Sequence, residues 1–197
     1  MRLNKIFLTL MVALCALAVP TASKAQDAGL KTNLVGDALL SPNVAVEIGL
    51  APRWTLDLSG ELNFWKVNEH SWKHVVFQPE ARYWFCERFA GHFLGVHALG
   101  GTFNVGNIDM DMTFLGTDFS KLKDRRYQGW GAGAGIAYGY AWPVHKHWNI
   151  EAEIGFGWVY TRFDSYPCAV CGTKLEDNKV HNYVGPTKAA VSVVYLF

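Results

Sequence analysis

The sequence predicts an all-β protein, an eight-stranded antiparallel transmembrane β-barrel. Downstream of residue 25, several stretches alternate apolar with small or polar residues at a period of two, which is the side-chain period of a β-strand. Their apolar bands are roughly 10 residues long and end in aromatics, as membrane-spanning strands do. After residue 25, no apolar run reaches the roughly 18 residues that a transmembrane helix needs. A closed sheet is then the structure that satisfies every backbone hydrogen-bonding group in lipid.

Residues 1–25 have the features of a cleaved secretory signal peptide, which leaves 26–197 as the barrel. A basic start with Arg2 and Lys5 precedes the apolar run Ile6–Val19, and small residues follow at Ser23 and Ala25. Removing this segment takes away three of the 18 Lys and Arg residues and none of the 17 Asp and Glu residues, which leaves a formal charge of −2. That balance does not favour nucleic acid as a partner. The expected location is the outer membrane of a Gram-negative bacterium.

The alternation divides the chain into eight expected strands. They are Leu30–Ala38, Asn43–Leu50, Trp54–Trp65, Trp72–Phe85, His92–Phe103, Tyr127–Trp142, Trp148–Arg162 and Lys179–Phe197. The clearest is Trp54–Trp65, in which one face is apolar and the other carries Asp57 and Glu61. His92–Phe103 is partly apolar on both faces, so its register stays open. The strand ending in Phe197 makes the barrel-assembly machinery an expected partner.

The connections also have the pattern of a membrane barrel, with short turns on one side and longer loops on the other. Short segments at 51–53, 86–88 and 143–147 are expected to be periplasmic turns. Longer segments at Lys66–Ser71, Asn104–Arg126 and Asp164–Asn178 are expected to be outer loops.

The face opposite the apolar one carries charge and is expected to point into the lumen. The expected lumen residues are Lys31, Asp37, Glu47, Asp57, Glu61, Glu80, Arg82, Glu151, Glu153 and Lys188. Eight strands leave an interior that side chains fill, so we expect a polar plug and not a solute pore. These charges must neutralise one another, because an unpaired buried ion costs several kcal/mol.

A Cys-x-x-Cys pair, Cys168 and Cys171, lies in the last expected loop. Such a pair can be a redox motif, half of a metal site or a small disulfide loop. An exported chain favours the disulfide. A zinc site would need two further ligands, for which His181 is close in sequence and His70 or His74 could approach from a neighbouring loop. Cys86, at a periplasmic turn, is expected to be a free or intermolecular thiol.

The longest loop ends in a basic run that is a candidate for binding lipopolysaccharide phosphates. It contains Lys121, Lys123, Arg125 and Arg126, and Lys and Arg pair well with phosphate oxygens. An ordinary solvated loop is the alternative.

Histidines near the outer rim allow an enzymatic alternative. His70, His74 and His181 are expected there with Glu69 and Ser71 nearby, so a Ser/His/acid constellation of a lipid-modifying barrel can be imagined. A solvated polar loop explains the same residues.

Several runs resemble a family of Bacteroidetes outer-membrane proteins of unknown function, over nearly all of residues 26–197. They are Lys31-Thr32-Asn33-Leu34 with Gly36-Asp37-Ala38, Asn43–Gly49, Pro52-Arg53-Trp54, Gln78-Pro79-Glu80-Ala81-Arg82-Tyr83-Trp84 and Asn104-Val105-Gly106. The resemblance implies a small outer-membrane barrel with a surface or fimbrial protein as a candidate partner, and it brings no catalytic residues. More distantly, the architecture is similar to OmpA-like and OmpX-like barrels.

These observations favour a structural, adhesive or accessory surface protein that acts through its outer loops and its contacts with outer-membrane lipid and lipopolysaccharide. No catalytic residue, cofactor or metal is expected in this interpretation. The alternatives are a lipid-modifying enzyme and a metal- or haem-binding surface protein that uses the loop cysteines and His181.

Overall fold

A computed structural model describes most of the chain after residue 26. The described residues are 27–64, 66–67, 70–106, 113–114, 117–118, 125–167 and 173–197. The elements are β1 (Ala28–Asn33), α2 (Leu34–Ala38), β2 (Asn43–Ala51), β3 (Trp54–Asn63), β4 (Lys66–Val67), β5 (His70–Trp84), β6 (Gly91–Gly106), β7 (Thr113–Phe114), β8 (Thr117–Asp118), β9 (Arg126–His145), β10 (Trp148–Tyr166) and β11 (Glu176–Leu196). No helix in this part of the chain is long and apolar enough to span a membrane.

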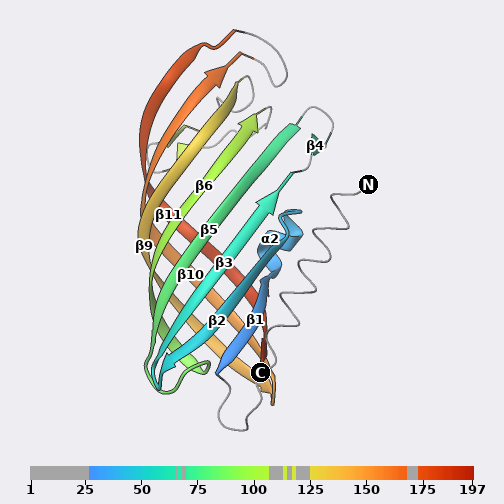
Figure 1. The fold of residues 1–197 in the computed structure, drawn as a ribbon, viewed down its shortest axis with the longest axis vertical. Helices are drawn as coiled ribbons and strands as arrows, with labels where there is room; N and C mark the ends of the chain where they lie inside the picture. Colours follow the sequence, from blue (N-terminus) through green and yellow to red (C-terminus); the bar gives the residue numbers. More distant parts are fainter. Residues whose placement is uncertain are drawn as a thin grey trace.

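Eight long strands close into a ring (Figure 1). Neighbours along the chain pair with one another, in the order β3-β2-β1-β11-β10-β9-β6-β5, and β5 pairs back to β3. Every pairing is antiparallel, including the closure of β1 on β11, where Gly29 lies opposite Leu196. The expected all-β ring of eight antiparallel strands is therefore confirmed.

The two ends of the ring differ in their connections. At one end, here called the turn end, short turns join β2 to β3 and β9 to β10 (Figure 1). Phe197 lies there, as does Asp27, whose carbonyl accepts a hydrogen bond from the Gly49 backbone. The opposite end, here called the loop end, carries the longer connections and the far ends of β9, β10 and β11.

The outer surface of the ring is apolar. Its exposed aliphatic and aromatic side chains include Val44, Val46, Ile48, Val75, Phe77, Leu94, Val96, Ile136, Tyr138, Ile150, Ile154, Phe156 and Val191. Exposed aromatics border this band at both ends. The turn-end girdle comprises Trp54, Phe85, Trp142, Trp148 and Phe197, and the loop-end girdle comprises Phe64, Trp72, Trp130 and Trp158. The period-two alternation thus produces an apolar outside and, as shown below, a charged inside.

The first expected strand is too long. Instead of continuing to Ala38, β1 ends at Asn33 and the chain turns into the five-residue helix α2. The Asn33 side chain causes the break, because its Oδ1 accepts hydrogen bonds from the backbone N–H groups of Val35 and Val191 (both 3.1 Å). Its Nδ2 donates to the carbonyl of Ala189 (3.2 Å). The amide therefore caps α2 and also occupies the edge of β11 where the next β1 residue would pair.

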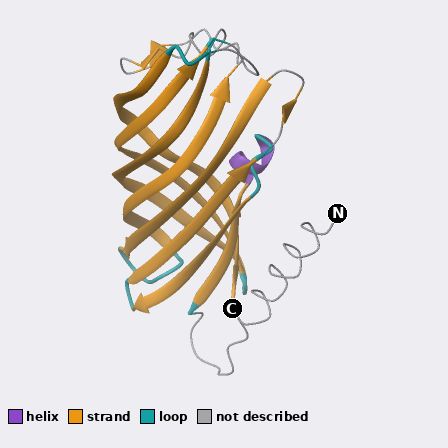
Figure 2. Cartoon of the chain, turned by 45° about the horizontal axis from the view of Figure 1, so that its top comes forward, coloured by secondary structure: helices purple, strands orange, loops and turns teal. Residues whose placement is uncertain are grey.

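Because β1 ends early, the wall of the ring is uneven. The last pair between β1 and β11 joins Asn33 to Ser192, whereas β11 stays paired with β10 as far as Glu176. Within the described residues, the part of β11 before Ser192 thus has a strand neighbour on one side only. In Figure 2, α2 (purple) lies beside the wall well below the ends of the longest strands.

The register of β6, which the sequence leaves open, is now defined. Phe93 and His97 are buried inside, and Leu94 and Val96 are exposed outside. His97 lies directly opposite Glu80 of β5 in the ladder. The two faces looked alike in sequence because the inward face at this level is partly apolar.

Candidate functional site

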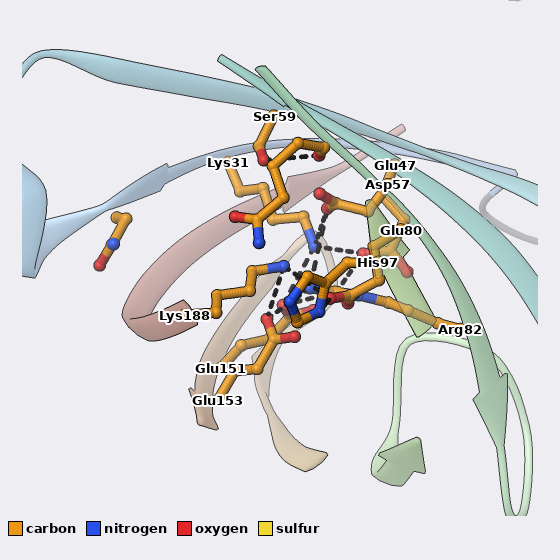
Figure 3. A network of polar contacts seen from close by, with 12 residues as sticks. Lys31, Glu47, Asp57, Ser59, Glu80, Arg82, His97, Glu151, Glu153 and Lys188 are labelled. Atoms are coloured by element: carbon orange, nitrogen blue, oxygen red, sulfur yellow. Dashed lines mark hydrogen bonds and ion pairs between the residues drawn. The ribbon is translucent and has the colours of Figure 1, made fainter. Parts of the chain in front are cut away.

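Charged side chains and one histidine from seven strands meet inside the ring (Figure 3). This lumen cluster consists of Lys31, Glu47, Asp57, Glu80, Arg82, His97, Glu151, Glu153 and Lys188, and each of these side chains is 10% exposed or less. Eight of the ten expected lumen residues belong to it. They come together because an inward position on each strand lies at the same height as inward positions on its neighbours.

Arg82 of β5 is the centre of the cluster. Its Nε donates to Glu80 (2.6 Å) and its Nη2 to Glu153 (2.7 Å). Its Nη1 donates to Glu47 (2.8 Å) and to Glu151 (3.1 Å). One guanidinium therefore holds four carboxylates from β2, β5 and β10, which a planar fork of five N–H donors can do and a lysine cannot.

Lys31 of β1 joins the same carboxylates from the other side. Its ammonium contacts Glu47, lies 2.6 Å from Asp57 and lies 3.1 Å from Glu151. Glu47 also accepts a hydrogen bond from the Thr55 hydroxyl. These contacts tie β1, β2, β3 and β10 together across the lumen.

Lys188 of β11 completes the cations, with its ammonium 3.0 Å from Glu80 and 3.1 Å from Glu153. The five carboxylates of the cluster outnumber Lys31, Arg82 and Lys188 by two. In the described part of the chain, one oxygen of Glu153 accepts no hydrogen bond. Such a surplus is costly in a dry interior, so contact with water is expected at this side of the cluster.

A cavity of about 280 Å³ provides that contact. It begins at the cluster, where Asp57, Arg82 and Glu153 line it, and it extends toward the loop-end limits of β1 and β2 at Asn33 and Asn43. Its remaining lining is mostly small or polar, namely Lys31, Thr32, Ala45, Ser59, Gly60, Glu61, Val76, Gln78, Thr187, Lys188, Ala189, Ala190 and Ser192.

Aromatic side chains close the lumen below the cluster, at the turn end. Trp84 and Phe93 are fully buried and their ring centroids lie 4.7 Å apart, with Phe89 beside them. The Phe89 carbonyl accepts a hydrogen bond from Asn149 (2.6 Å), and its φ of 65° places the turn in the left-handed region. The Arg82 guanidinium lies 4.5 Å from the centre of the Phe93 ring, so the ionic and aromatic layers are in direct contact.

His97 was not expected in the site. Its Nε2 lies 2.8 Å from the Thr187 hydroxyl, and its Nδ1 lies 3.4 Å from a Glu80 oxygen. Two glycines make room for the ring, because a Cβ on Gly135 would come within 2.6 Å of His97 and a Cβ on Gly155 within 3.0 Å. The only sequence signal for this contact was the run of glycines in β9.

Two expected lumen residues lie outside the cluster. The prediction for Asp37 is wrong: its exposed side chain belongs to α2 and accepts hydrogen bonds from Thr32 (2.7 Å) and Asn43 (3.1 Å), because β1 ends before reaching it. Glu61 does point inward, but higher, where it lies 2.9 Å from His74 and lines the cavity.

Several expected loop residues fall outside the described part of the chain. They are Cys168, Cys171, Lys121, Lys123 and the side chain of His70. Arg125 and Arg126 are described and half-buried at the loop end, where the Arg126 guanidinium lies 4.5 Å from the centre of the Tyr166 ring. Cys86 is exposed at the turn end with a free thiol. Among the described residues, no group of three or more His, Cys, Asp and Glu side chains is arranged to hold a metal.

The tip of the β10–β11 hairpin has its own ion pairs. Lys174 lies 2.9 Å from Asp164 and 2.8 Å from Asp177. A hydrogen bond from the Asn178 backbone, followed by the one from Lys174, lowers the pKa of the Asp164 carboxyl below its usual range. Hydrogen bonds to Asp177 and Asp164 raise the pKa of Lys174. These pairs on exposed side chains join the loop-end parts of β10 and β11 and contribute little to stability.

The ring and its filled lumen define a class, an all-β protein whose eight strands enclose a buried ionic core. Residues 10–197 match the family model described as "Protein of unknown function (DUF3575)", and the chain belongs to that family. Comparison with curated proteins and with solved structures found no match.

Proposed function

We propose that this chain is an outer-membrane β-barrel that anchors a binding surface at its loop end. The observation that carries the proposal is the sidedness of the wall, with charged side chains buried inside and an exposed apolar band outside. A soluble protein rarely exposes so continuous an apolar surface. Membrane barrels carry aromatic residues at the two interfaces of the bilayer, so the turn-end and loop-end girdles support the proposal.

The lumen supports an anchor and not a pore. The lumen cluster crosses the ring and the layer of Trp84, Phe89 and Phe93 closes it at the turn end. A solute would have to break the ion pairs of Arg82 to pass.

The activity of such an anchor then lies in its loops. The loop end would face outward, since short turns face the periplasm in outer-membrane barrels. There the chain would act as a structural, adhesive or accessory protein with a surface or fimbrial partner, and Arg125, Arg126, Lys121 and Lys123 would contact lipopolysaccharide phosphates. The strand ending at Phe197 would be the part read by the barrel-assembly machinery.

The membrane location is tested by cell fractionation and extraction. The full chain is expected in the outer-membrane fraction and is expected to dissolve only in detergent. It should also migrate differently on gels before and after heating. Release by aqueous buffer as a stable monomer would contradict the proposal.

The loop assignment is tested by crosslinking in intact cells. The intact chain is expected to capture a surface protein or lipopolysaccharide, and a variant with Asn104–Arg126 shortened is expected to lose the capture. A variant with the Lys66–Ser71 connection shortened is the matched control and should keep it. Equal capture by all three chains would contradict the assignment to the longest loop.

A further inference from the structure

Three side chains in the lumen form a chain of contacts that none of the functions above uses. The Thr187 hydroxyl lies 2.8 Å from Nε2 of His97. Nδ1 of the same ring lies 3.4 Å from a Glu80 oxygen, which is within ion-pair distance but is not a hydrogen bond in this structure. Hydroxyl, imidazole and carboxylate in this order are the arrangement that activates a nucleophilic oxygen.

The fold aligns these groups from three strands. Glu80 and His97 lie directly opposite each other on β5 and β6, so the carboxylate faces the ring across one ladder step. Gly135 and Gly155 leave the space in which the ring lies. Replacing either with alanine would place a methyl group against the imidazole.

Thr187 lies at an irregularity of β11. Gly155 of β10 pairs with Lys188 and the next residue, Phe156, pairs with Pro186, so Thr187 is the extra residue of a β-bulge. A bulge turns a side chain out of the regular alternation and occurs often next to active sites. Here it lets Thr187 and Lys188, neighbours in the chain, both line the cavity.

The cavity next to Thr187 holds unused hydrogen-bonding capacity. Gln78 lines the same cavity, and its buried Nε2 has no hydrogen-bond partner in the described part of the chain. A buried donor without a partner costs roughly 1–3 kcal/mol. An oxyanion that forms in the cavity would accept from such a donor, or from the Lys188 ammonium.

The cavity extends to Asn33 and Ala189, where the strand pairing between β1 and β11 ends. Next to this point, α2 and its C-terminal turn present exposed Leu34, Leu39 and Leu40. A molecule with a polar head and an apolar tail would fit here, with the head in the cavity and the tail along these exposed leucines.

We propose that Thr187 and His97 form a catalytic site that hydrolyses carboxylic esters of amphiphiles, with Glu80 as a positioning residue. The source of the amphiphile, the outer leaflet of the membrane, rests on the proposed location. The ester chemistry rests on the geometry alone.

The reaction needs only the ester and water. His97 Nε2 takes the Thr187 proton as Oγ1 bonds to the ester carbonyl carbon, and Gln78 or Lys188 stabilises the oxyanion. The carbon–oxygen bond to the alcohol then breaks, and the alcohol leaves with the proton from His97. His97 then takes a proton from water, which attacks the carbonyl carbon of the acyl-threonine. The bond between that carbon and Thr187 Oγ1 breaks, the carboxylic acid leaves, and His97 returns the proton to the Thr187 oxygen.

The first test labels the nucleophile in the purified full-length protein in detergent micelles. A fluorophosphonate is expected to modify Thr187, located by mass spectrometry of peptides, and the Thr187→Val and His97→Gln variants are expected to lose the label. Thr102→Val, which removes an exposed hydroxyl from the outside of β6, is the matched control and should label normally. Absence of label on Thr187 in the intact protein would overturn the proposal.

The second test measures hydrolysis of p-nitrophenyl palmitate and p-nitrophenyl butyrate in mixed micelles. Thr187→Val is expected to lower kcat/KM by about 1,000-fold or more, and Thr187→Ser should keep measurable activity because it keeps the hydroxyl. Heat-dependent gel migration reports folding for every variant. Hydrolysis that persists in folded Thr187→Val would overturn the site, and faster cleavage of the butyrate would overturn the amphiphile as its substrate.

Glu80 is tested through the split between kcat and KM. Glu80→Gln is expected to lower kcat and leave KM within about twofold, because the carboxylate orients His97 and does not touch the ester. A rise in KM with unchanged kcat would contradict the positioning role and would mean that Glu80 contributes to substrate binding instead. Extraction of the protein by aqueous buffer would contradict the proposed membrane location. It would leave the ester site open, because that site is tested by the labelling of Thr187.

Discussion

At the scale of single residues, Arg82 matters most, because its guanidinium pairs with carboxylates of β2, β5 and β10. Arg82→Met keeps a long side chain but leaves those carboxylates without their shared cation. Removing one partner of a buried ion pair costs about 3–5 kcal/mol, so the free energy of unfolding should fall by at least that amount. Denaturant titration of the folded protein in micelles measures it.

The control for this variant is Arg53→Met in the exposed turn between β2 and β3. It removes the same charge and should change the unfolding free energy by less than about 0.5 kcal/mol. Equal losses in the two variants would show that the lumen cluster does not stabilise the ring.

Gly139 provides a second prediction about a single residue. A Cβ there would lie 2.3 Å from the Phe93 ring and 2.8 Å from the Ala152 carbonyl. Gly139→Ala should therefore displace the aromatic layer and destabilise the protein by about 1–3 kcal/mol. Near-ultraviolet circular dichroism of the buried aromatics and denaturant titration report the two effects.

Gly60→Ala is the matched change, because a Cβ at Gly60 meets no atom within 4 Å. We expect it to be neutral or slightly stabilising. A comparable loss in both variants would mean that strand flexibility, and not the space for Phe93, explains these glycines.

The sequence predicts sidedness well and contact partners poorly. Glu47, Asp57 and Glu151 could be assigned to the inside because strand alternation requires only local information. His97 could not be paired with Thr187, since that contact depends on a bulge in β11 and on two glycines in β9 and β10. The bulge leaves no periodic signal, and the alternating glycines of β9 do not show which side chain fills the space beside them.

At the scale of elements, the stretch from Asn33 to Asn43 departs most from the pattern. Asn43 holds it together, with Oδ1 accepting from the Asn33 N–H (2.6 Å) and Nδ2 donating to the carbonyls of Asn33 (3.0 Å) and Ser41 (3.2 Å). An apolar run such as Leu34 and Val35 looks like strand in sequence. It forms a helix because asparagine side chains take over the backbone groups that a continued β1 would need.

Asn43→Ala should loosen α2 without opening the ring. The amides of Leu39, Leu40 and Ser41, which bond to carbonyls within the same stretch, are expected to exchange hydrogen about tenfold faster, corresponding to about 1–2 kcal/mol of local stability. Hydrogen exchange with mass spectrometry measures this. Asn182→Ala on the exposed face of β11 should leave these amides unchanged, and protected amides in Asn43→Ala would contradict the role given to this side chain.

At the scale of the whole molecule, the uneven wall and the filled lumen have one origin. Seven strands contribute to the lumen cluster, and the aromatic layer of Trp84, Phe89 and Phe93 closes the ring at its turn end. The loop-end half of the ring therefore does not require every strand to be paired on both sides. The pairing of β1 with β11 ends at Asn33, whereas β11 stays paired with β10 as far as Glu176. The part of the cavity lined by Asn33 and Asn43 lies in this half, away from the ionic core.

The last prediction tests which part of the wall meets hydrocarbon. Ile136 is 67% exposed and pairs with Val96 and Phe156, midway between Trp142 and Trp130 along β9. If the apolar band lies in a bilayer, Ile136→Arg should destabilise the folded protein in lipid vesicles by about 2–4 kcal/mol, because an arginine at the midplane is costly.

Val144→Arg is the control, since Val144 is 62% exposed but lies beyond Trp142 of the turn-end girdle. Near the interface the same substitution should cost about 0–1 kcal/mol. Unfolding in urea from vesicles gives both values, and repeating it in a detergent whose micelle adapts its thickness should reduce the difference. Equal costs at the two positions would mean that the apolar band is covered by protein and not by lipid.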